Sequence, residues 1–354
     1  MAEIKTETKT LEAKCLCGSV HLTFDIPVAL LPLPVYLCHC SLCRYATGSP
    51  CVFHTQLPEG LLPSFVGESG EDKMTSWVSR GAGCSYDFCS TCGCHIAGVG
   101  LDRNQWTPAT SIFSDHGGAN FIIDRHVFSK SAKGGGLSSM LTHLGGREMP
   151  CWNPASDDPA GQLVEAQAEM GDDGESRLRA ECKCGGVSFA IRRPNQAVLD
   201  DDVMSRCVSP KAKEKWMAEH DVCDDCRLTS GTHVVGWAKV PLALCEPAID
   251  TGLRVGTSKT FASSEGVLRA FCGVCGATVF RCSVTHRPTE GQAVVDVATG
   301  ILRAPEGVLA ENWLTWKSRL AFAASGMAYD VEFAEALSKG MEAWAEQRYG
   351  VEES

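Results

Sequence analysis

The chain has 354 residues, which is enough for two domains of ordinary size, and its composition is that of a globular protein. The formal net charge of −11 argues against a broad basic face, so we do not expect a nucleic-acid partner. No apolar run reaches the length of about 18 residues that a membrane helix needs, so we expect no membrane partner. The polar N-terminus does not resemble a signal peptide.

The chain contains 20 cysteines, and many occur in short pairs at the spacings typical of zinc ligands. A disulfide framework is typical of small secreted domains, whereas thiols stay reduced inside cells. We therefore interpret the paired cysteines as ligands for Zn²⁺ and expect a cytoplasmic protein.

In chain order, the sequence opens with a Cys-x-Cys pair, a Cys-His-Cys-x-x-Cys motif and a Cys-x-x-Cys pair. Together they supply seven thiols: Cys15, Cys17, Cys38, Cys40, Cys43, Cys89 and Cys92. A structural zinc site closes with four protein ligands, while a catalytic site keeps three and leaves one position open. Seven thiols divide naturally into four plus three, which predicts one site of each kind.

The pattern recurs in the second half of the chain. The two Cys-x-x-Cys motifs return 183 positions later, and the Cys-x-Cys pair returns 167 positions later, which leaves 16 extra residues before the second central motif. The repeated cysteines are Cys182, Cys184, Cys223, Cys226, Cys272 and Cys275. A constant register over some fifty residues indicates a duplicated domain. We expect a first domain over 1–154, an acidic linker over 155–178 and a second domain over 179–354.

The fold class that the sequence predicts is mainly β. Polar and apolar residues alternate over 19–24 and 187–191, and glycine and proline recur at short intervals. One or two helical turns are expected around residues 213–217. Apolar residues at helical spacing over 333–344 predict C-terminal helices on the second domain, with Asp330 as a helix N-cap and Gly350 as the end.

The four-cysteine set of each copy fits a tetrahedral zinc site. In the first copy the remaining thiols, Cys38, Cys40 and Cys43, suit a zinc ion with an open position. Arg44 follows them and would either stabilise thiolates, bind a substrate carboxylate or form a salt bridge. His39 is expected to point away from the metal.

The second copy departs from this motif, because Asp221 stands where the first copy has Cys38. Asp221 or Cys207 would complete a second site with Cys223 and Cys226, or that site has lost its metal. The general acid or base is left open among the histidines of the first domain: His54, His95, His116, His126 and His143.

The order of the motifs resembles the glutathione-dependent formaldehyde-activating enzyme family, which includes centromere protein V. The resemblance is carried by Cys15-Leu16-Cys17-Gly18-Ser19-Val20, by the stretch from Cys38 to Gly48 and by the stretch from Phe88 to Gly93. Residues 125–130 and Trp152 are similar to the closing His, Lys and Trp of the family. The second domain resembles a divergent copy, and the tandem arrangement is similar to that of fungal members.

The resemblance implies two tandem zinc-binding β-tent domains, with a catalytic zinc at Cys38, Cys40 and Cys43. It implies condensation of glutathione with formaldehyde, formally a carbon–sulfur lyase reaction of the S-(hydroxymethyl)glutathione synthase kind. Two alternatives stay open: a zinc-assisted elimination or rearrangement on a glutathione conjugate or natural-product intermediate, and a non-catalytic zinc module that binds a partner.

Overall fold

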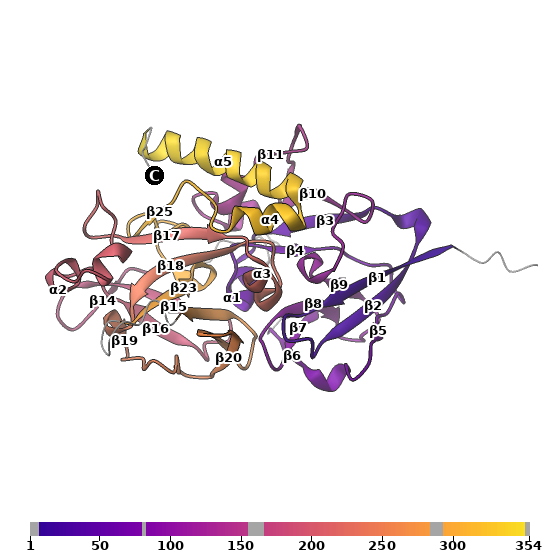
Figure 1. Cartoon of the computed structure of the whole chain (residues 1–354), viewed down its shortest axis with the longest axis horizontal. Coiled ribbons are helices and arrows are strands. Elements are labelled where there is room, and N and C mark those ends of the chain that lie inside the picture. Colours follow the sequence, from indigo (N-terminus) through magenta and orange to yellow (C-terminus); the bar gives the residue numbers. More distant parts are fainter. Residues whose placement is uncertain (1–6, 80–82, 155–165, 284–292, 351–354) are drawn as a thin grey trace, which may run out of the picture.

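The structure is a computed structural model of the chain that describes residues 7–79, 83–154, 166–283 and 293–350. It is mainly β, as the sequence predicts, with two β-rich halves side by side and a long C-terminal helix along one face (Figure 1). Within the described residues, no helix is long and apolar enough to cross a membrane.

Within the described residues, the first half contains three main sheets and a small hairpin, and residues 21–24 of the strand predicted over 19–24 lie in β2. One sheet joins β1 (Thr8–Lys14), β2 (His21–Pro27) and β5 (Ser64–Phe65). A second joins β13 (Cys151–Trp152), β10 (Phe121–Val127), β3 (Leu33–Cys38) and β4 (Val52–His54). A third joins β6 (Met74–Val78), β7 (Cys84–Cys89), β8 (His95–Gly100) and β9 (Trp106–Pro108), and the hairpin is β11 (His143–Leu144) with β12 (Arg147–Glu148).

The second half repeats this strand order, but its two larger sheets are fused into one. That sheet runs through β20 (Ser258–Ser264), β21 (Val267–Cys272), β22 (Thr278–Ser283), β23 (Val294–Ala298), β18 (Val235–Pro241), β17 (Trp216–Asp221) and β25 (Leu314–Trp316). The smaller sheet joins β14 (Glu169–Met170), β15 (Ser176–Glu181), β16 (Ser188–Ile191) and β19 (Cys245–Glu246), and β24 (Leu302–Arg303) pairs with β15.

Strand register confirms the duplication. Cys38 of β3 pairs with Val52 of β4, and the residues 183 positions later, Asp221 and Val235, pair in the same way. Both copies also add a parallel partner, because β3 pairs with β10 and β17 pairs with β25. The central motif therefore begins at the end of the same strand in both copies.

Two short helices that the sequence analysis missed begin inside the central motifs: α1 (Ser41–Thr47) and α3 (Asp224–Ser230). Each begins at a cysteine N-cap, Cys40 or Cys223, whose sulfur accepts the backbone N–H three residues on. Each ends at a glycine with positive φ, Gly48 at 77° or Gly231 at 72°, the conformation that commonly ends a helix. The two helices hold the thiols at the junction of the halves.

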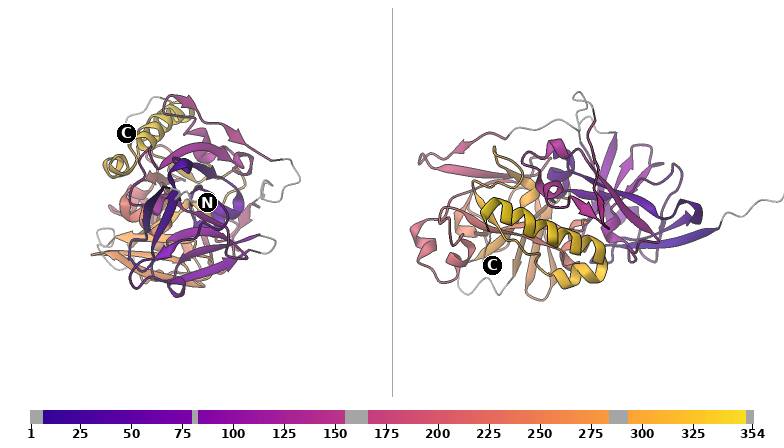
Figure 2. Two further views of the ribbon diagram at one scale, coloured as in Figure 1. Left: turned by 90° about the vertical axis from the view of Figure 1, so that its right-hand side faces the viewer. Right: turned by 90° about the horizontal axis from the view of Figure 1, so that it is seen from above.

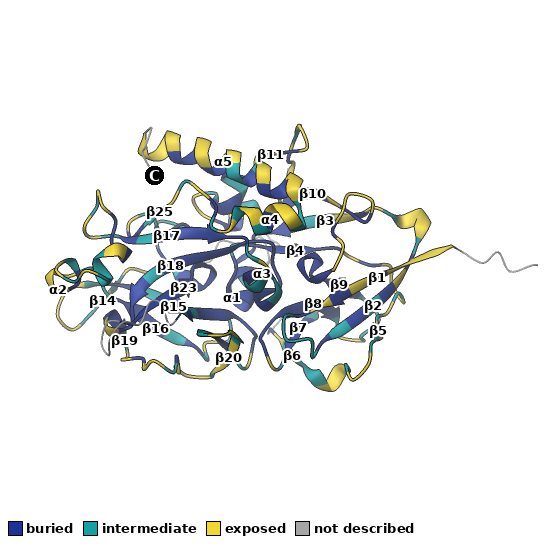
Figure 3. Ribbon diagram, in the orientation of Figure 1, coloured by how far each residue is buried: buried dark blue, intermediate teal, exposed yellow. Residues whose placement is uncertain are grey.

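The predicted C-terminal helices are confirmed as α4 (Ala323–Tyr329) and α5 (Val331–Tyr349), with Asp330 as the N-cap and Gly350 as the C-cap of α5. The inner face of α5 is buried and its outer face is exposed (Figure 3). The helices also contact the first half, since Tyr329 donates to the carbonyls of Thr110 and Phe113.

The prediction of helical turns around residues 213–217 is wrong. The strand β17 begins at Trp216, whose ring is fully buried. A further short helix of the second half is α2 (Gln196–Leu199). Part of the acidic segment expected as a linker is folded: β14 pairs with β15, and Arg179 forms an ion pair with Glu169. Residues 155–165 of that segment lie outside the described residues.

The two halves contact each other through equivalent positions. The N–H of Leu16 donates to the carbonyl of Leu228 at 3.1 Å, and the N–H of Lys183 donates to that of Tyr45 at 2.8 Å. Lys183 corresponds to Leu16 in the repeat, and Leu228 corresponds to Tyr45. The contact is therefore built like the isologous interface of a twofold dimer, inside one chain. Figure 2 shows α5 lying across this junction when the molecule is seen from above.

Candidate metal centres

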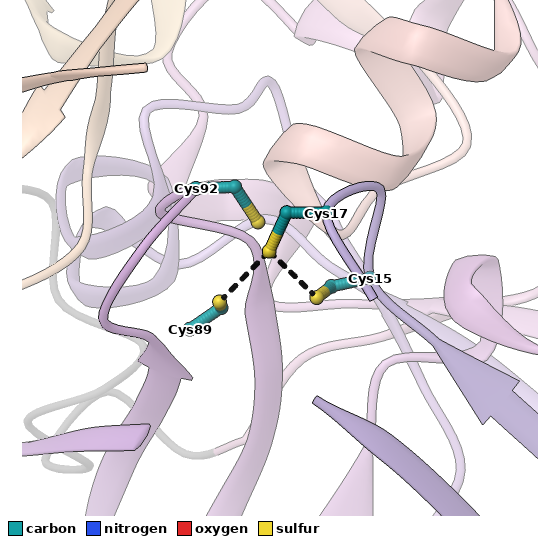
Figure 4. A group of neighbouring side chains, drawn as sticks. All are labelled: Cys15, Cys17, Cys89 and Cys92. Atoms are coloured by element: carbon teal, nitrogen blue, oxygen red, sulfur yellow. Dashed lines mark hydrogen bonds between the residues drawn. The ribbon is translucent and has the colours of Figure 1, made fainter. Parts of the chain in front are cut away.

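The first four-cysteine cluster consists of Cys15, Cys17, Cys89 and Cys92, which the fold brings together from the β1–β2 and β7–β8 turns (Figure 4). The sulfur of Cys17 lies 3.5 Å from that of Cys15 and 3.6 Å from that of Cys89. All four sulfurs lie within 4.8 Å of one another. A tetrahedral ion with arms of about 2.3 Å separates its sulfurs by roughly 3.8 Å, so the geometry suits zinc.

The second four-cysteine cluster, Cys182, Cys184, Cys272 and Cys275, has the same arrangement. The sulfur of Cys184 lies 3.5 Å from those of both Cys182 and Cys272. Contacts with neighbouring thiols raise the pKa of Cys92 in the first cluster and of Cys275 in the second. Four thiols this close would not all ionise without a cation, so the donor set fits a bound metal ion.

The three-cysteine cluster, Cys38, Cys40 and Cys43, lies where β3 meets α1, and all three side chains are buried. Contacts with Cys38 and Cys43 hold the pKa of Cys40 well below its usual value, while contact with Cys40 raises the pKa of Cys38. The cluster thus gathers negative charge in a poorly solvated place, which a cation would relieve. No fourth cysteine joins this group among the described residues.

Tyr86 of β7 is a neighbour of this cluster that sequence reasoning missed. Its hydroxyl lies 3.4 Å from the sulfur of Cys43, and its side chain is buried. Burial, together with the charge of Cys43 and Cys40, raises the pKa of Tyr86 well above its usual value, so the phenol stays protonated. A protonated hydroxyl beside an open metal position is placed to donate a hydrogen bond.

Half-buried apolar side chains pack against the cluster and its buried neighbours: Tyr36, Leu42, Trp77, Cys84 and Phe128. Phe128 has a φ of 56°, a strained conformation for a residue with a side chain, and its ring meets that of Trp152 edge to face at 5.4 Å. Trp152 is 49% exposed. Half-buried aromatic side chains therefore pack beside the cluster, and one of them, Phe128, contacts the exposed Trp152.

Arg44 is buried, and both of its identified hydrogen bonds go to backbone carbonyls. Its Nε donates to His39 at 3.1 Å and its Nη2 to Ser131 at 3.2 Å. The guanidinium therefore braces the loop that carries the thiols. Its charge also contributes to the lowered pKa of Cys40, after the contacts with the other two cysteines.

His39 points to a second histidine instead of to the sulfurs, as the sequence predicts. Its Nε2 lies 2.8 Å from Nδ1 of His126, whose Nε2 lies 2.8 Å from the carbonyl of Leu141. The carbonyl accepts only, so His126 donates to Leu141 and accepts from His39. Burial lowers the pKa of both histidines, and they remain neutral supports of the loop.

The other histidines are spread through the first half. His54 and His95 meet through their Nε2 atoms at 2.8 Å, and burial lowers the pKa of His95 to about 4. His116 bridges Asp330 and His233 near the start of α5. His143 is exposed.

The second-copy cluster consists of Asp221, Cys223 and Cys226, whose ligand atoms lie within 4.8 Å of one another. Of the two residues expected to complete the pair, Asp221 is the one that the fold brings there. Cys207 is buried at the end of a short 3₁₀ turn and is not part of this group.

Comparison with known proteins agrees with this geometry. Residues 10–116 match the model of the family described as glutathione-dependent formaldehyde-activating enzyme, so this part of the chain is similar to that family. The matched segment contains the whole first four-cysteine cluster and the whole three-cysteine cluster. The description of the family names glutathione and formaldehyde. No curated protein matches the chain.

Two patterns in the sequence could have predicted the short helices and the additional residues beside the clusters. A cysteine N-cap followed eight residues later by glycine marks α1 and α3. Carrying the offset of 183 beyond the cysteines pairs Tyr86 with Arg269, and these two residues face equivalent sulfurs.

Proposed function

We propose that the chain is a zinc-dependent carbon–sulfur lyase that forms or cleaves the adduct of a thiol, glutathione, with an aldehyde or related electrophile. The observation that carries this proposal is the three-cysteine cluster, which gathers three buried thiols beside half-buried aromatic side chains. The four-cysteine clusters are complete tetrahedral sets, so they are assigned structural zinc ions. In this proposal 1–154 and 179–354 are the two structural units, and the free thiols suit a reducing compartment such as the cytoplasm.

The reaction balances without an oxidant or reductant. The thiol sulfur attacks the carbonyl carbon, a C–S bond forms, and the π pair of the carbonyl moves to its oxygen. That oxygen takes up a proton, and the thiol proton is released. A zinc ion at the three-cysteine cluster would hold the substrate thiolate or polarise the carbonyl oxygen, and so remove the cost of ionising a thiol with a pKa of about 8.5.

The residues of the chain have distinct roles in this scheme. Cys38, Cys40 and Cys43 would hold the ion, and Arg44 positions their loop through the carbonyls of His39 and Ser131. Tyr86 donates a hydrogen bond to the oxygen of the adduct, where negative charge develops. We assign Tyr86 this role because its hydroxyl is buried, protonated and next to Cys43.

Exchange NMR with glutathione and formaldehyde tests the proposal, because it measures the interconversion of free and adducted thiol at equilibrium. Wild type should accelerate the exchange above the uncatalysed rate, and Cys40→Ser should return it to that rate. Cys223→Ser is the matched control, since it alters the equivalent N-cap in the second copy and should leave catalysis intact. A screen of other aldehydes and conjugates follows if formaldehyde is not turned over.

Catalysis that survives Cys40→Ser would rule out the metal role. A wild-type protein that accelerates no thiol–electrophile exchange, yet holds its metal ions inertly, would instead be a binding module.

A further inference from the structure

The second-copy cluster has the backbone of a metal site. Asp221, Cys223 and Cys226 occupy the positions of Cys38, Cys40 and Cys43, at the end of the same strand and the start of the same helix. A phenylalanine with positive φ is also retained: Phe322, with a φ of 57°, follows Ala321, which bridges Asp221, just as Phe128 follows Val127, which pairs with Cys38. Backbone alone would predict a second open metal site.

The side chain that faces the last sulfur is different. In the first copy the hydroxyl of Tyr86 lies 3.4 Å from Cys43. In the second copy the residue 183 positions later, Arg269, directs Nη1 and Nη2 at the sulfur of Cys226, at 3.6 and 3.5 Å. A neutral phenol has been exchanged for a buried guanidinium at the same place.

A second guanidinium approaches from the neighbouring strand. Nη1 of Arg281 lies 3.7 Å from Oδ2 of Asp221 and 3.1 Å from Oδ2 of Asp296. The first copy has Gly98 at the position of Arg281. Asp221 is further engaged through Oδ1, which accepts the N–H of Cys223 at 2.8 Å. The sulfur of Cys226 and both carboxylate oxygens of Asp221 therefore already have cationic or N–H partners.

We propose that the second-copy cluster is a metal-free ion-pair centre, in which the guanidinium groups of Arg269 and Arg281 take the place of the metal ion. A divalent cation there would face two fixed positive charges at close range, in a poorly solvated site. In the three-cysteine cluster the cation nearby is Arg44, which is directed at backbone carbonyls. The residue at the position of Tyr86 and Arg269 thus selects between a metal site and an ion pair, and the chain binds three metal ions instead of four.

Metal analysis of the purified full chain tests this inference without reference to activity. Wild type should contain three zinc ions per chain, and Cys223→Ser/Cys226→Ser should still contain three. The matched variant Cys40→Ser/Cys43→Ser should contain two. Loss of one ion from the second-copy variant, or four ions in wild type, would overturn the inference. An unchanged metal content in Cys40→Ser/Cys43→Ser would instead refute the proposed active site.

Two variants that place residues of one copy at the equivalent positions of the other test the role of Tyr86 and Arg269. Tyr86→Arg should lower the metal content from three to two, while the remaining two ions and the circular dichroism spectrum report that the fold is intact. Asp221→Cys/Arg269→Tyr/Arg281→Gly should raise it to four. If these variants do not fold, Cys223→Ser alone tests the inference, because Cys223 is partly exposed and its substitution should be tolerated. The metal content of Cys223→Ser should stay at three, whereas it would fall if Cys223 were a metal ligand.

Discussion

Phe88 and Phe271 meet edge to face across the junction of the two halves, with ring centroids 6.3 Å apart and ring planes at 71°. They are the same residue of the repeat, each one position before a Cys-x-x-Cys turn. Each ring packs on the glycine that ends the turn of the opposite copy, Phe271 on Gly93 and Phe88 on Gly276. A turn that carries two cysteines of a four-cysteine cluster is thus also the contact between copies, so a metal ion bound there would couple metal binding to association of the halves.

Gly93→Ala and Gly276→Ala should destabilise the protein by similar amounts. A Cβ would lie 2.3 Å from Phe271 in the first case and 2.6 Å from Phe88 in the second, and both glycines have a φ of 80°. Gly185→Ala is the control, because its φ is 75° but no atom lies within 4 Å of the added carbon. In denaturant unfolding, we expect the control to lose about 1–2 kcal/mol of unfolding free energy, from backbone strain alone. The other two variants should lose more. Equal losses in all three would contradict the interlocked contact.

The repeat explains why the four-cysteine clusters were predictable. Their ligands are adjacent pairs in the sequence, and a constant register identified both sets. The same reasoning left Asp221 and Cys207 as equal candidates, since which of them reaches Cys223 depends on the fold of the 16-residue insertion. The contact of Arg269 with Cys226 depends on how β21 lies over α3, which no local pattern encodes. The crossing of Phe271 onto Gly93 likewise requires the relative placement of the two halves.

Tyr86→Phe should reduce turnover by roughly tenfold or more while the metal content stays at the wild-type value, because it removes a donor and keeps the ring. Tyr45→Phe is the matched control: its ring lies 3.2 Å from the guanidinium of Arg303, and Phe preserves that contact. Exchange NMR and metal analysis on the same samples separate the two effects. A loss of metal together with activity would mean that Tyr86 supports the cluster and does not act on the adduct.

The metal ion of the three-cysteine cluster should be the first that a chelator removes. Three thiols leave a position through which a chelator forms a mixed complex, whereas four close the coordination sphere. Timed treatment with a chelator and a chromogenic zinc indicator should therefore release one ion rapidly and two slowly. Activity should fall with the fast phase while the circular dichroism spectrum is unchanged. Release of all ions in one phase, with unfolding, would contradict the assignment of separate roles.

His220 should make the stability of the protein fall at acid pH. Its ring is buried against Trp316, with centroids 4.4 Å apart, and neither ring nitrogen has a hydrogen-bond partner among the described residues. Burial lowers the pKa of His220 to about 3. Because the unfolded chain has the ordinary pKa of about 6.5, it binds a proton that the folded protein does not. The titration of His220 therefore does not lower the free energy of unfolding above pH 6.5. The free energy of unfolding decreases as the pH falls from 6.5 towards 3, and the decrease is about 2 kcal/mol at pH 5.

His220→Leu tests this directly, since the first copy has Leu37 at the equivalent position. The difference in unfolding free energy between variant and wild type should grow by about 2 kcal/mol in favour of the variant between pH 7 and pH 5. Protonation of the cysteine clusters affects both proteins alike, so it cancels in the difference. Leu37→His, which buries an imidazole in the first copy, should show the opposite trend. Parallel pH profiles for His220→Leu and wild type would show that His220 titrates normally in the folded protein.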